Sequence, residues 1–191
     1  MQDDSKVFNQ ALQLEVLVNN MTEISPAFML EFDKNNLVNL VIPPGITEIQ
    51  DNTFFKCENL KSVVLPDTLT CIRSSAFEKC HSLKSIVIPD SVTYIEFDAF
   101  YDCINLESVA LPKNLTRIPA GMFFSCKNLT SIDIPENVQF IGSSAFQCCS
   151  KLKTVHLPDN VREICHRAFA ECDELSQDFK QTIAKRVRNV I

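Results

Sequence analysis

The 191-residue sequence has no Trp, only 3 Gly and no long uninterrupted apolar run. So little Gly argues against Gly-rich phosphate-binding loops and against flexible linkers. A net charge of −6 argues against non-specific nucleic-acid binding, which depends on a basic surface. No apolar stretch approaches the roughly 18 residues that a membrane-spanning helix requires. We therefore expect neither a nucleic-acid partner nor a membrane span.

The first residues are polar and acidic, from Met1 through Asp3 and Asp4 to Lys6. A secretory signal begins with a basic stretch that an apolar run follows. The chain as given therefore predicts a cytoplasmic protein. Delivery into a host cell is the alternative, as is export if the chain has been trimmed.

Four residue types recur with a period of 23 residues and without an insertion. The series are Pro43, Pro66, Pro89, Pro112, Pro135, Pro158; Phe54, Phe77, Phe100, Phe123, Phe146, Phe169; Cys57, Cys80, Cys103, Cys126, Cys149, Cys172; and Leu60, Leu83, Leu106, Leu129, Leu152, Leu175. A fixed period of this length is the signature of a repeat array whose units stack on one another.

Each 23-residue unit contains a short alternating segment, such as Leu106-x-x-Val109-x-Leu111. Alternation places Val109 and Leu111 on one face of a strand, and the following Pro112 ends the strand because it has no N–H to donate. A second apolar pair, Val92 and Ile95, has counterparts in every unit. The Ala-Phe-x-x-Cys segment has helical spacing over about one turn, which predicts a 3₁₀ or single α turn.

The pattern L-x-x-V-x-L-P-x-x-L-x-x-I-x-x-x-A-F-x-x-C-x-x-L, repeated over residues 37–175, resembles the BspA-like, or Treponema-type, leucine-rich repeats. The resemblance implies an α+β repeat solenoid: a right-handed coil with a short parallel β-sheet on its concave face and caps at its ends. Many family members are surface or secreted proteins implicated in adhesion and protein binding. This chain departs from the family by keeping the Gly after the second-strand Ile only once, as Gly142.

We expect three regions: an N-terminal cap at 1–36, the repeats at 37–175 and a C-terminal capping helix at 176–191. The N-terminal cap would be formed by an apolar cluster that comprises Phe8, Leu12, Leu14, Val16 and Leu17. At the other end, the residues Phe179, Ile183, Val187 and Ile191 fall on one helical face, and Ser176 is a suitable N-cap. The alternative for this basic, amphipathic helix is contact with a membrane or a partner.

The six periodic cysteines form a ladder rather than a tetrahedral cluster, which argues against a zinc site. We expect them to be reduced and buried, although neighbouring rungs are close enough for disulfides. Cys71, Cys148 and Cys165 lie off the ladder and are expected to be more accessible. The sequence has no catalytic motif, and the neighbours Cys165 and His166 are only a weak candidate for a nucleophilic pair. We predict no cofactor, no metal and no enzymatic activity.

Function should lie in the residues that vary between repeats. Two outward-facing columns of the first strand are candidates, one small and polar, the other apolar for four rungs: Asn39, Ser62, Ser85, Ser108, Ser131, Thr154; and Val41, Val64, Val87, Ala110, Asp133, His156. A rival patch precedes the second-strand Ile and consists of Tyr94, Arg117 and Phe140, residue types common in binding hot spots. The predicted contact residues are Val64, Val87, Ser85, Ser108, Asp133, His156, Tyr94, Arg117 and Phe140. Exposed Val can simply reflect strand propensity, and Arg117 can stack on the rings for internal packing.

The leading hypothesis is a rigid, monomeric module that binds a protein or peptide partner mainly through its concave strand face. The alternatives are a surface adhesin and a host-directed bacterial protein of the BspA-like type. An enzyme is the weakest hypothesis, because no titratable cluster is apparent.

Overall fold

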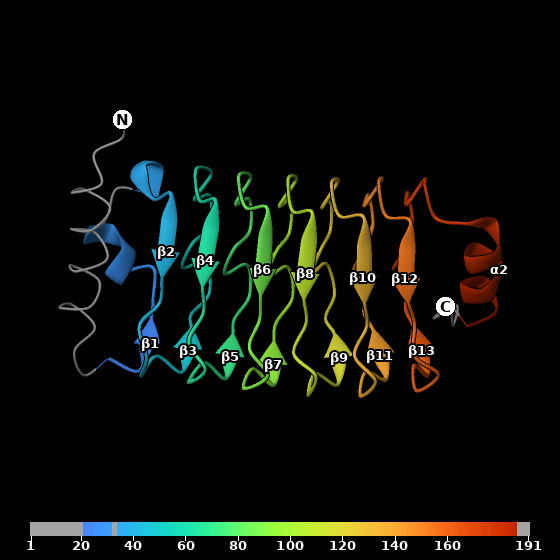
Figure 1. The fold of residues 1–191 in the computed structure, drawn as a ribbon, viewed down its shortest axis with the longest axis horizontal. Coiled ribbons are helices and arrows are strands. Elements are labelled where there is room, and N and C mark those ends of the chain that lie inside the picture. The colour runs from blue at the N-terminus through green and yellow to red at the C-terminus, as the bar shows by residue number, and fades with distance from the viewer. Residues whose placement is uncertain (1–20, 32–33, 187–191) are drawn as a thin grey trace.

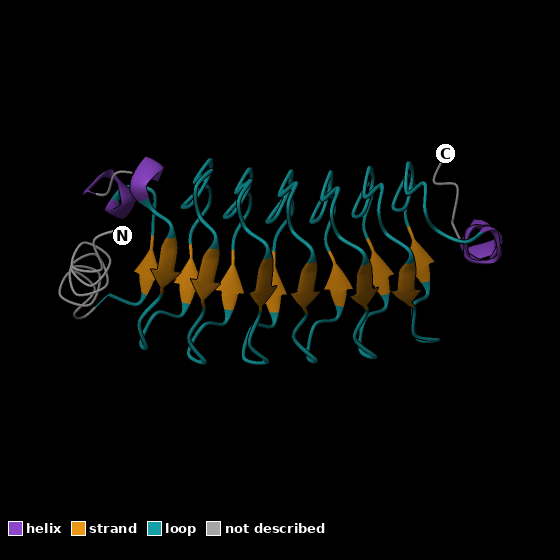
Figure 2. Ribbon diagram, turned by 45° about the horizontal axis from the view of Figure 1, so that its top comes forward, coloured by secondary structure: helices purple, strands orange, loops and turns teal. Residues whose placement is uncertain are grey.

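The computed structural model describes residues 21–31 and 34–186, which form a rod of stacked turns (Figure 1). The cluster predicted as an N-terminal cap, from Phe8 to Leu17, lies outside the described residues. Seen in Figures 1 and 2, the turns stand in a nearly straight row, with one strand row beside the other. We call the outward surface of the first row the first-strand face and that of the second row the second-strand face.

The first row consists of three-residue strands, one from each repeat. These are β2 (Asn39–Val41), β4 (Ser62–Val64), β6 (Ser85–Val87), β8 (Ser108–Ala110), β10 (Ser131–Asp133) and β12 (Thr154–His156). Paired strands are parallel and in register, as in Ser85 with Ser108 and Val87 with Ala110. The middle residue of each strand points inward and the two outer residues are exposed, as alternation predicts.

The second row consists of two-residue strands that end on the periodic apolar residue. These are β1 (Glu23–Ile24), β3 (Glu48–Ile49), β5 (Cys71–Ile72), β7 (Tyr94–Ile95), β9 (Arg117–Ile118), β11 (Phe140–Ile141) and β13 (Glu163–Ile164). The first of them lies within the region expected to be a cap, yet β1 pairs with β3 in the same parallel register as the others. Two 3₁₀ helices, η1 (Phe28–Glu31) and η2 (Lys34–Asn36), connect it to β2.

Proline directs the chain from the first row to the second. The carbonyl oxygen of Pro89 accepts a hydrogen bond from the Val92 N–H (3.0 Å), and Pro112 and Leu115 form the same bond at 3.1 Å.

A second consequence of proline is seen at Pro119, which directly follows β9. The second row is split there into the sheets β1-β3-β5-β7 and β9-β11-β13. In other repeats the residue at this position donates its N–H to the carbonyl oxygen of the second-strand Ile one turn earlier, as Glu96 does to Ile72 (2.9 Å). Pro119 cannot form this bond because proline has no N–H to donate.

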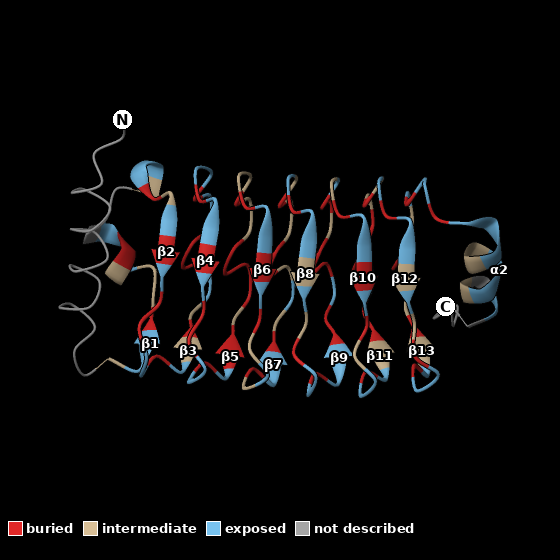
Figure 3. Ribbon diagram, viewed as in Figure 1, coloured by how far each residue is buried: buried red, intermediate tan, exposed pale blue. Residues whose placement is uncertain are grey.

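The core is built around a continuous stack of the periodic phenylalanine rings. Neighbouring rings from Phe54 to Phe169 lie 5.1–5.6 Å apart between centroids, with interplanar angles of 2–19°. Phe54 through Phe146 are fully buried. Phe179 ends the stack by meeting Phe169 edge-on, at 5.5 Å and 84°. Burial follows this plan along the rod, with apolar interior positions and exposed ridges (Figure 3).

Phe179 belongs to the helix α2 (Gln177–Arg186), which lies across the C-terminal end of the rod (Figure 1). The Ser176 hydroxyl accepts the Phe179 N–H at 3.2 Å, so Ser176 is the N-cap, as the sequence predicts. Phe179 and Ile183 are partly buried against the core. The capping role of 176–191 stays a prediction for its last residues, since Val187 and Ile191 lie outside the described part.

The Ala-Phe-x-x-Cys segment is not the helical turn that its spacing predicts. Its residues alternate between two directions of hydrogen bonding: Phe77 donates to Ala99 of the next turn (2.8 Å), whereas Glu78 donates to Ser75 of its own (3.1 Å). The segment is bounded by residues with positive φ, here Ser75 (54°) and Lys79 (60°). Backbone N–H groups that a helix would use internally therefore bond to the next turn instead, and the residues with positive φ interrupt the helical conformation.

Candidate protein-binding surfaces

The first-strand face presents the two predicted columns in parallel. The apolar column exposes its valines, with Val64 56% and Val87 69% exposed, and Val41 also exposed. The second column is short and polar, and begins with a hydrogen bond from Ser62 Oγ to Asn39 Oδ1 (2.6 Å). Exposed valines beside serines make a ridge next to a shallow strip.

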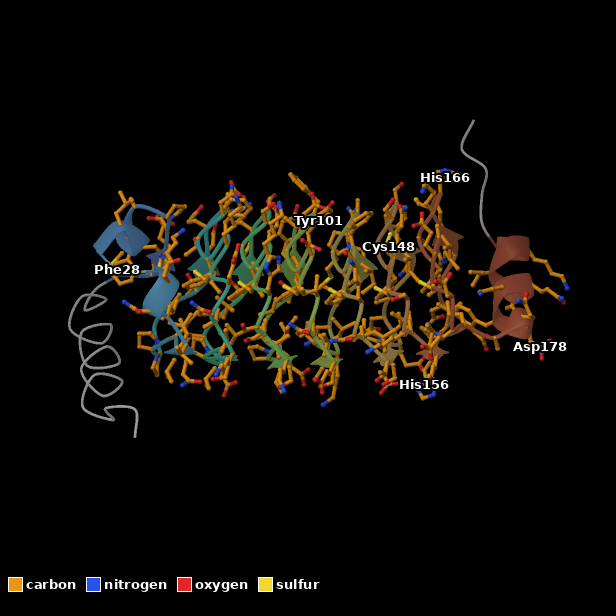
Figure 4. All side chains as sticks on the ribbon, turned by 90° about the horizontal axis from the view of Figure 1, so that it is seen from above. Phe28, Tyr101, Cys148, His156, His166 and Asp178 are labelled. Carbon is orange, nitrogen blue, oxygen red and sulfur yellow. The ribbon has the colours of Figure 1, made fainter. Side chains whose placement is uncertain are left out.

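At the C-terminal end of this face the apolar column changes character. Asp133 and His156 occupy paired positions of β10 and β12, and Asp133 Oδ1 contacts His156 Nδ1. Both side chains are exposed. Figure 4 shows His156 on the opposite side of the rod from His166 and Tyr101. The structure thus places Ser85, Ser108, Val64, Val87, Asp133 and His156 on one surface.

The rival patch lies on the second-strand face and is brought together only in part. Arg117 and Phe140 are paired across β9 and β11, and the Arg117 guanidinium lies 5.0 Å from the centroid of the Phe140 ring. Tyr94, which is 48% exposed, belongs to the separate sheet on the other side of the break at Pro119. Arg117 therefore stacks on one of the two rings proposed for it. Phe97, also exposed, adds apolar area near Tyr94.

A polar network on the N-terminal part of the second-strand face was missed in the sequence. Arg73 Nη1 binds Glu96 Oε1 at 2.8 Å, its Nε binds Glu48 Oε1, and Ser74 Oγ donates to Glu96 Oε2 at 2.6 Å. Burial opposes ionisation of Glu96, yet the hydrogen bonds from Ser74 and Arg73 hold its pKa below its ordinary value. The signal was the column that follows the second-strand Ile, in which Arg73 and Glu96 carry opposite charges 23 residues apart.

The structure corrects the prediction that Cys71 is accessible. Cys71 is buried, at 9% exposure, on β5, which lies between β3 and β7 in its sheet. Arg73, two residues further along the chain, binds Glu48, the residue paired with Cys71. Burial raises its pKa to about 11, against the nearby Arg73 charge. Cys148 and Cys165 are half-buried.

The ladder cysteines are buried donors rather than reactive groups. Each thiol from Cys80 onward donates to the carbonyl oxygen of the core Phe in the preceding turn, at 3.0–3.3 Å. Burial raises the pKa of Cys103 to about 12 and that of Cys126 well above its ordinary range. A thiol with a raised pKa is a poor nucleophile at neutral pH.

The weak nucleophile candidate gains no support from geometry. Cys165 Sγ lies 3.9 Å from Glu163 Oε1, and burial and that carboxylate raise its pKa. His81, the remaining histidine off the strand face, lies between Asp102 (3.4 Å) and Glu58 (4.0 Å).

Within residues 21–31 and 34–186, no group of three His, Cys, Asp or Glu side chains is arranged to hold a metal ion. No helix of that part is long and apolar enough to cross a membrane.

Comparison with known proteins agrees with this architecture. The model of the BspA-type leucine-rich repeat region matches residues 22–139 and 70–185, in six copies. The chain belongs to this family. BspA-type repeats form a scaffold fold that generally mediates protein interactions and generally carries no catalytic site, and the two-row solenoid described above is the form it takes here.

Solved leucine-rich repeat proteins share the fold. The Treponema pallidum protein TpLRR is 30% identical over 87% of this chain and 78% of its own, with a TM-score of 0.80. A leucine-rich repeat protein from Eubacterium ventriosum is 26% identical over 73% of this chain and 38% of its own (TM-score 0.68). A leucine-rich repeat protein from Bacteroides ovatus is 27% identical over 68% of this chain and 40% of its own (TM-score 0.55). No curated protein sequence matches this chain significantly.

Proposed function

We propose that the chain is a non-enzymatic protein-interaction module that binds a protein or peptide partner through its first-strand face. The exposed Val64 and Val87 carry the proposal, because they lie on neighbouring rungs of strands that are each held by a parallel partner, β4 by β2 and β6 by β8. Contiguous exposed apolar area marks interaction sites. A ligand that spans several turns meets side chains about every 4.8 Å, without having to order the receptor first.

Tyr94 and Phe140 are the rival anchors. The first-strand face is favoured because Val41, Val64 and Val87 are exposed on three successive rungs, although its strands are hydrogen-bonded only as the pairs β2-β4, β6-β8 and β10-β12. The rival patch straddles the break between β7 and β9, and the Arg117 charge is already engaged on the Phe140 ring. Contacts that serve internal packing leave less of that surface for a partner.

The ladder of free thiols supports the proposal that the protein functions in a reducing compartment, as a cytoplasmic or host-delivered protein would. Each ladder thiol from Cys80 onward uses its S–H as a donor, and a disulfide would remove that donor. Surface adhesion, the alternative that the family resemblance raises, would place the chain in an oxidising environment. Intact mass before and after alkylation separates the two proposals, since disulfides would favour adhesion.

Paired substitutions test the proposed surface. Val64→Glu with Val87→Glu is compared with Tyr94→Ala and Phe140→Ala in affinity capture from native extract, each variant first shown to keep the wild-type thermal melt. We expect the first pair to lose specifically captured proteins and the second pair to retain them. The reverse pattern would place the contact on the second-strand face.

A further inference from the structure

The turns are bonded without interruption only on the side of the rod that carries Tyr101, opposite His156, which we call the turn side (Figure 4). Every other N–H there donates to a carbonyl oxygen of the next turn, at 2.7–3.2 Å. These bonds recur between all neighbouring turns, in the segments that begin at Asn52, Ser75, Asp98, Gly121 and Ser144. The turn side therefore joins the repeats along the whole rod.

The second row lacks this continuity at one place, between β7 and β9, which belong to separate sheets (Figure 1). Elsewhere the residue before each second-row strand donates its N–H to the preceding turn, as Thr93 does to Thr70 (3.1 Å) and Gln139 to Thr116 (2.9 Å). Among the described residues, Thr116 donates no such bond, and Pro119 on the other side of β9 has no N–H. The second row is therefore unbonded across this junction.

Pro119 keeps the junction from closing. A ring carbon replaces the N–H hydrogen that other repeats use, so the backbone cannot approach the Ile95 carbonyl oxygen to hydrogen-bond distance. It lies against the following turn instead. A Cβ on Gly142 would come within 2.5 Å of the Ala120 nitrogen and 2.7 Å of the Pro119 carbonyl carbon. Gly142 thus leaves room for the backbone that follows Pro119, which packs on the C-terminal part of the rod.

The other sides of the same junction stay bonded. In the first row, β6 pairs with β8 in parallel register. On the turn side, Asp98 donates to Ala120 (3.0 Å) and Asp102 to Phe124 (2.7 Å). The ring stack also passes through the junction without a break. The two parts of the rod are thus joined along two sides and free along the third.

The first row is interrupted as well, between β4 and β6 and between β8 and β10. These interruptions differ in kind, because no proline occupies a donor position of that row. At the second of them the Thr130 N–H still donates to the Glu107 carbonyl oxygen at 3.5 Å. Only between β7 and β9 does the covalent structure remove a donor.

We propose that the junction between β7 and β9 is a hinge, at which the rod bends as the second row opens and closes about the β6–β8 pair and the turn side. Residues at the ends of secondary-structure elements are common hinge positions, and Pro119 directly follows β9. Bending at a junction with fewer backbone bonds costs less than bending where all sides are bonded.

The hinge divides the first-strand face into two parts. Val41, Val64 and Val87 lie on the N-terminal side of it, whereas Asp133 and His156 lie on the C-terminal side. Bending therefore changes the position of the apolar rungs relative to the polar pair. A partner that contacts both parts would select one bend of the rod. This consequence for binding rests on the function proposed above.

Pairs of nitroxide labels on two sides of the rod test the hinge. One pair replaces Thr47 and Arg162 beside the second row, and the other replaces Glu58 and Asp173 on the turn side. All four residues are exposed, and each pair lies five repeats apart, or about 24 Å at 4.8 Å per turn. The labels are attached to ketone-bearing residues, so that the cysteines stay unmodified. Double electron–electron resonance on the full chain gives each distance distribution.

We expect the second-row distribution to be about twice as broad as the turn-side distribution. Pro119→Ala restores an N–H that can donate to the Ile95 carbonyl oxygen, and should narrow the second-row distribution to the turn-side width. Pro119→Gln restores the same N–H with the side chain that Gln50 has at the equivalent position. The control Pro135→Ala removes a proline without adding a donor between β7 and β9, and should change neither distribution.

Equal widths on the two sides of the wild-type rod would overturn the hinge, whatever the mean second-row distance. A broad second-row distribution that both Pro119 variants leave unchanged would overturn the role of Pro119. Thermal melts show which variants fold, and the wild-type comparison decides the matter even if neither does. None of these results depends on capture of a partner through Val64 and Val87, so failure of the hinge and failure of the proposed function are distinguishable.

Discussion

The Cys126 thiol donates to the carbonyl oxygen of Phe100, one turn earlier, at 3.3 Å. That carbonyl also accepts the N–H of Cys103 in its own turn at 3.3 Å. The cysteine thus links two features that the period alone shows side by side, the thiol ladder and the ring stack. Cysteine recurs here because its side chain fills a small buried space and satisfies a carbonyl of the neighbouring turn.

Removing one ladder thiol should destabilise the rod. Cys126→Ala deletes the S–H donor and leaves a small cavity, which together should lower the free energy of unfolding by about 1–2 kcal/mol. Cys148→Ala is the matched control, because that thiol is half-buried and bonds an exposed carboxylate, and should cost less than about 0.5 kcal/mol. Urea unfolding measures both. Equal decreases in the free energy of unfolding in the two variants would contradict a structural role for the ladder.

Thiol accessibility should divide the cysteines into two classes. At pH 8 a soluble disulfide reagent should label no more than Cys148 and Cys165 in the folded chain, and slowly, since the pKa of each thiol is raised mainly by burial. The buried cysteines, Cys71 among them, should react only in denaturant. Fast reaction of Cys71, detected by peptide mass spectrometry, would contradict its burial on β5.

Stability should fall in alkali. Burial raises the pKa of Cys57 to about 11 and the pKa values of Cys103 and Cys172 to about 12, whereas unfolded thiols ionise near 9.0. Above pH 9 the unfolded state therefore binds fewer protons than the folded state, so the free energy of unfolding decreases as pH rises. The contribution of each buried thiol approaches about 1.4 kcal/mol per pH unit once the unfolded thiol is fully ionised.

Urea unfolding at pH 8, 9 and 10 should show this decline. The Cys103→Ala variant starts from a lower stability but should decline less, by about 1.4 kcal/mol in total between pH 8 and pH 10. Parallel lines for wild type and variant would mean that Cys103 ionises in the folded state as readily as in the unfolded state.

Core and surface substitutions should differ clearly in their effect on the free energy of unfolding. Phe100→Ala empties the middle of the ring stack and should cost about 3–5 kcal/mol. Val87→Ser replaces an exposed side chain and should change stability by less than about 0.5 kcal/mol. Thermal melts of the two variants check the register, which would be wrong if both melted like the wild type.

The period predicted most of this fold because four residue types locked to 23 positions fix which side chains share the core. It placed the Phe100 rung and the exposed columns of Val87 and Ser85 correctly. It did not reveal hydrogen bonding between turns, so the segment around Phe77 was expected to be helical. Cys71 was misplaced because it lies outside the periodic cysteine series, whereas the structure buries it on β5, between β3 and β7. The strand β1 was missed because residues 1–36 lack the periodic Phe and Cys.

Photo-cross-linking tests most directly whether the first-strand face is the contact surface. A photoreactive phenylalanine replaces Val87 in one protein and Tyr94 in another, both exposed and both folded by thermal melt. Irradiation in native extract is followed by denaturing electrophoresis. We expect discrete adducts from position 87 and none from position 94. Adducts from position 94 without any from position 87 would contradict the account.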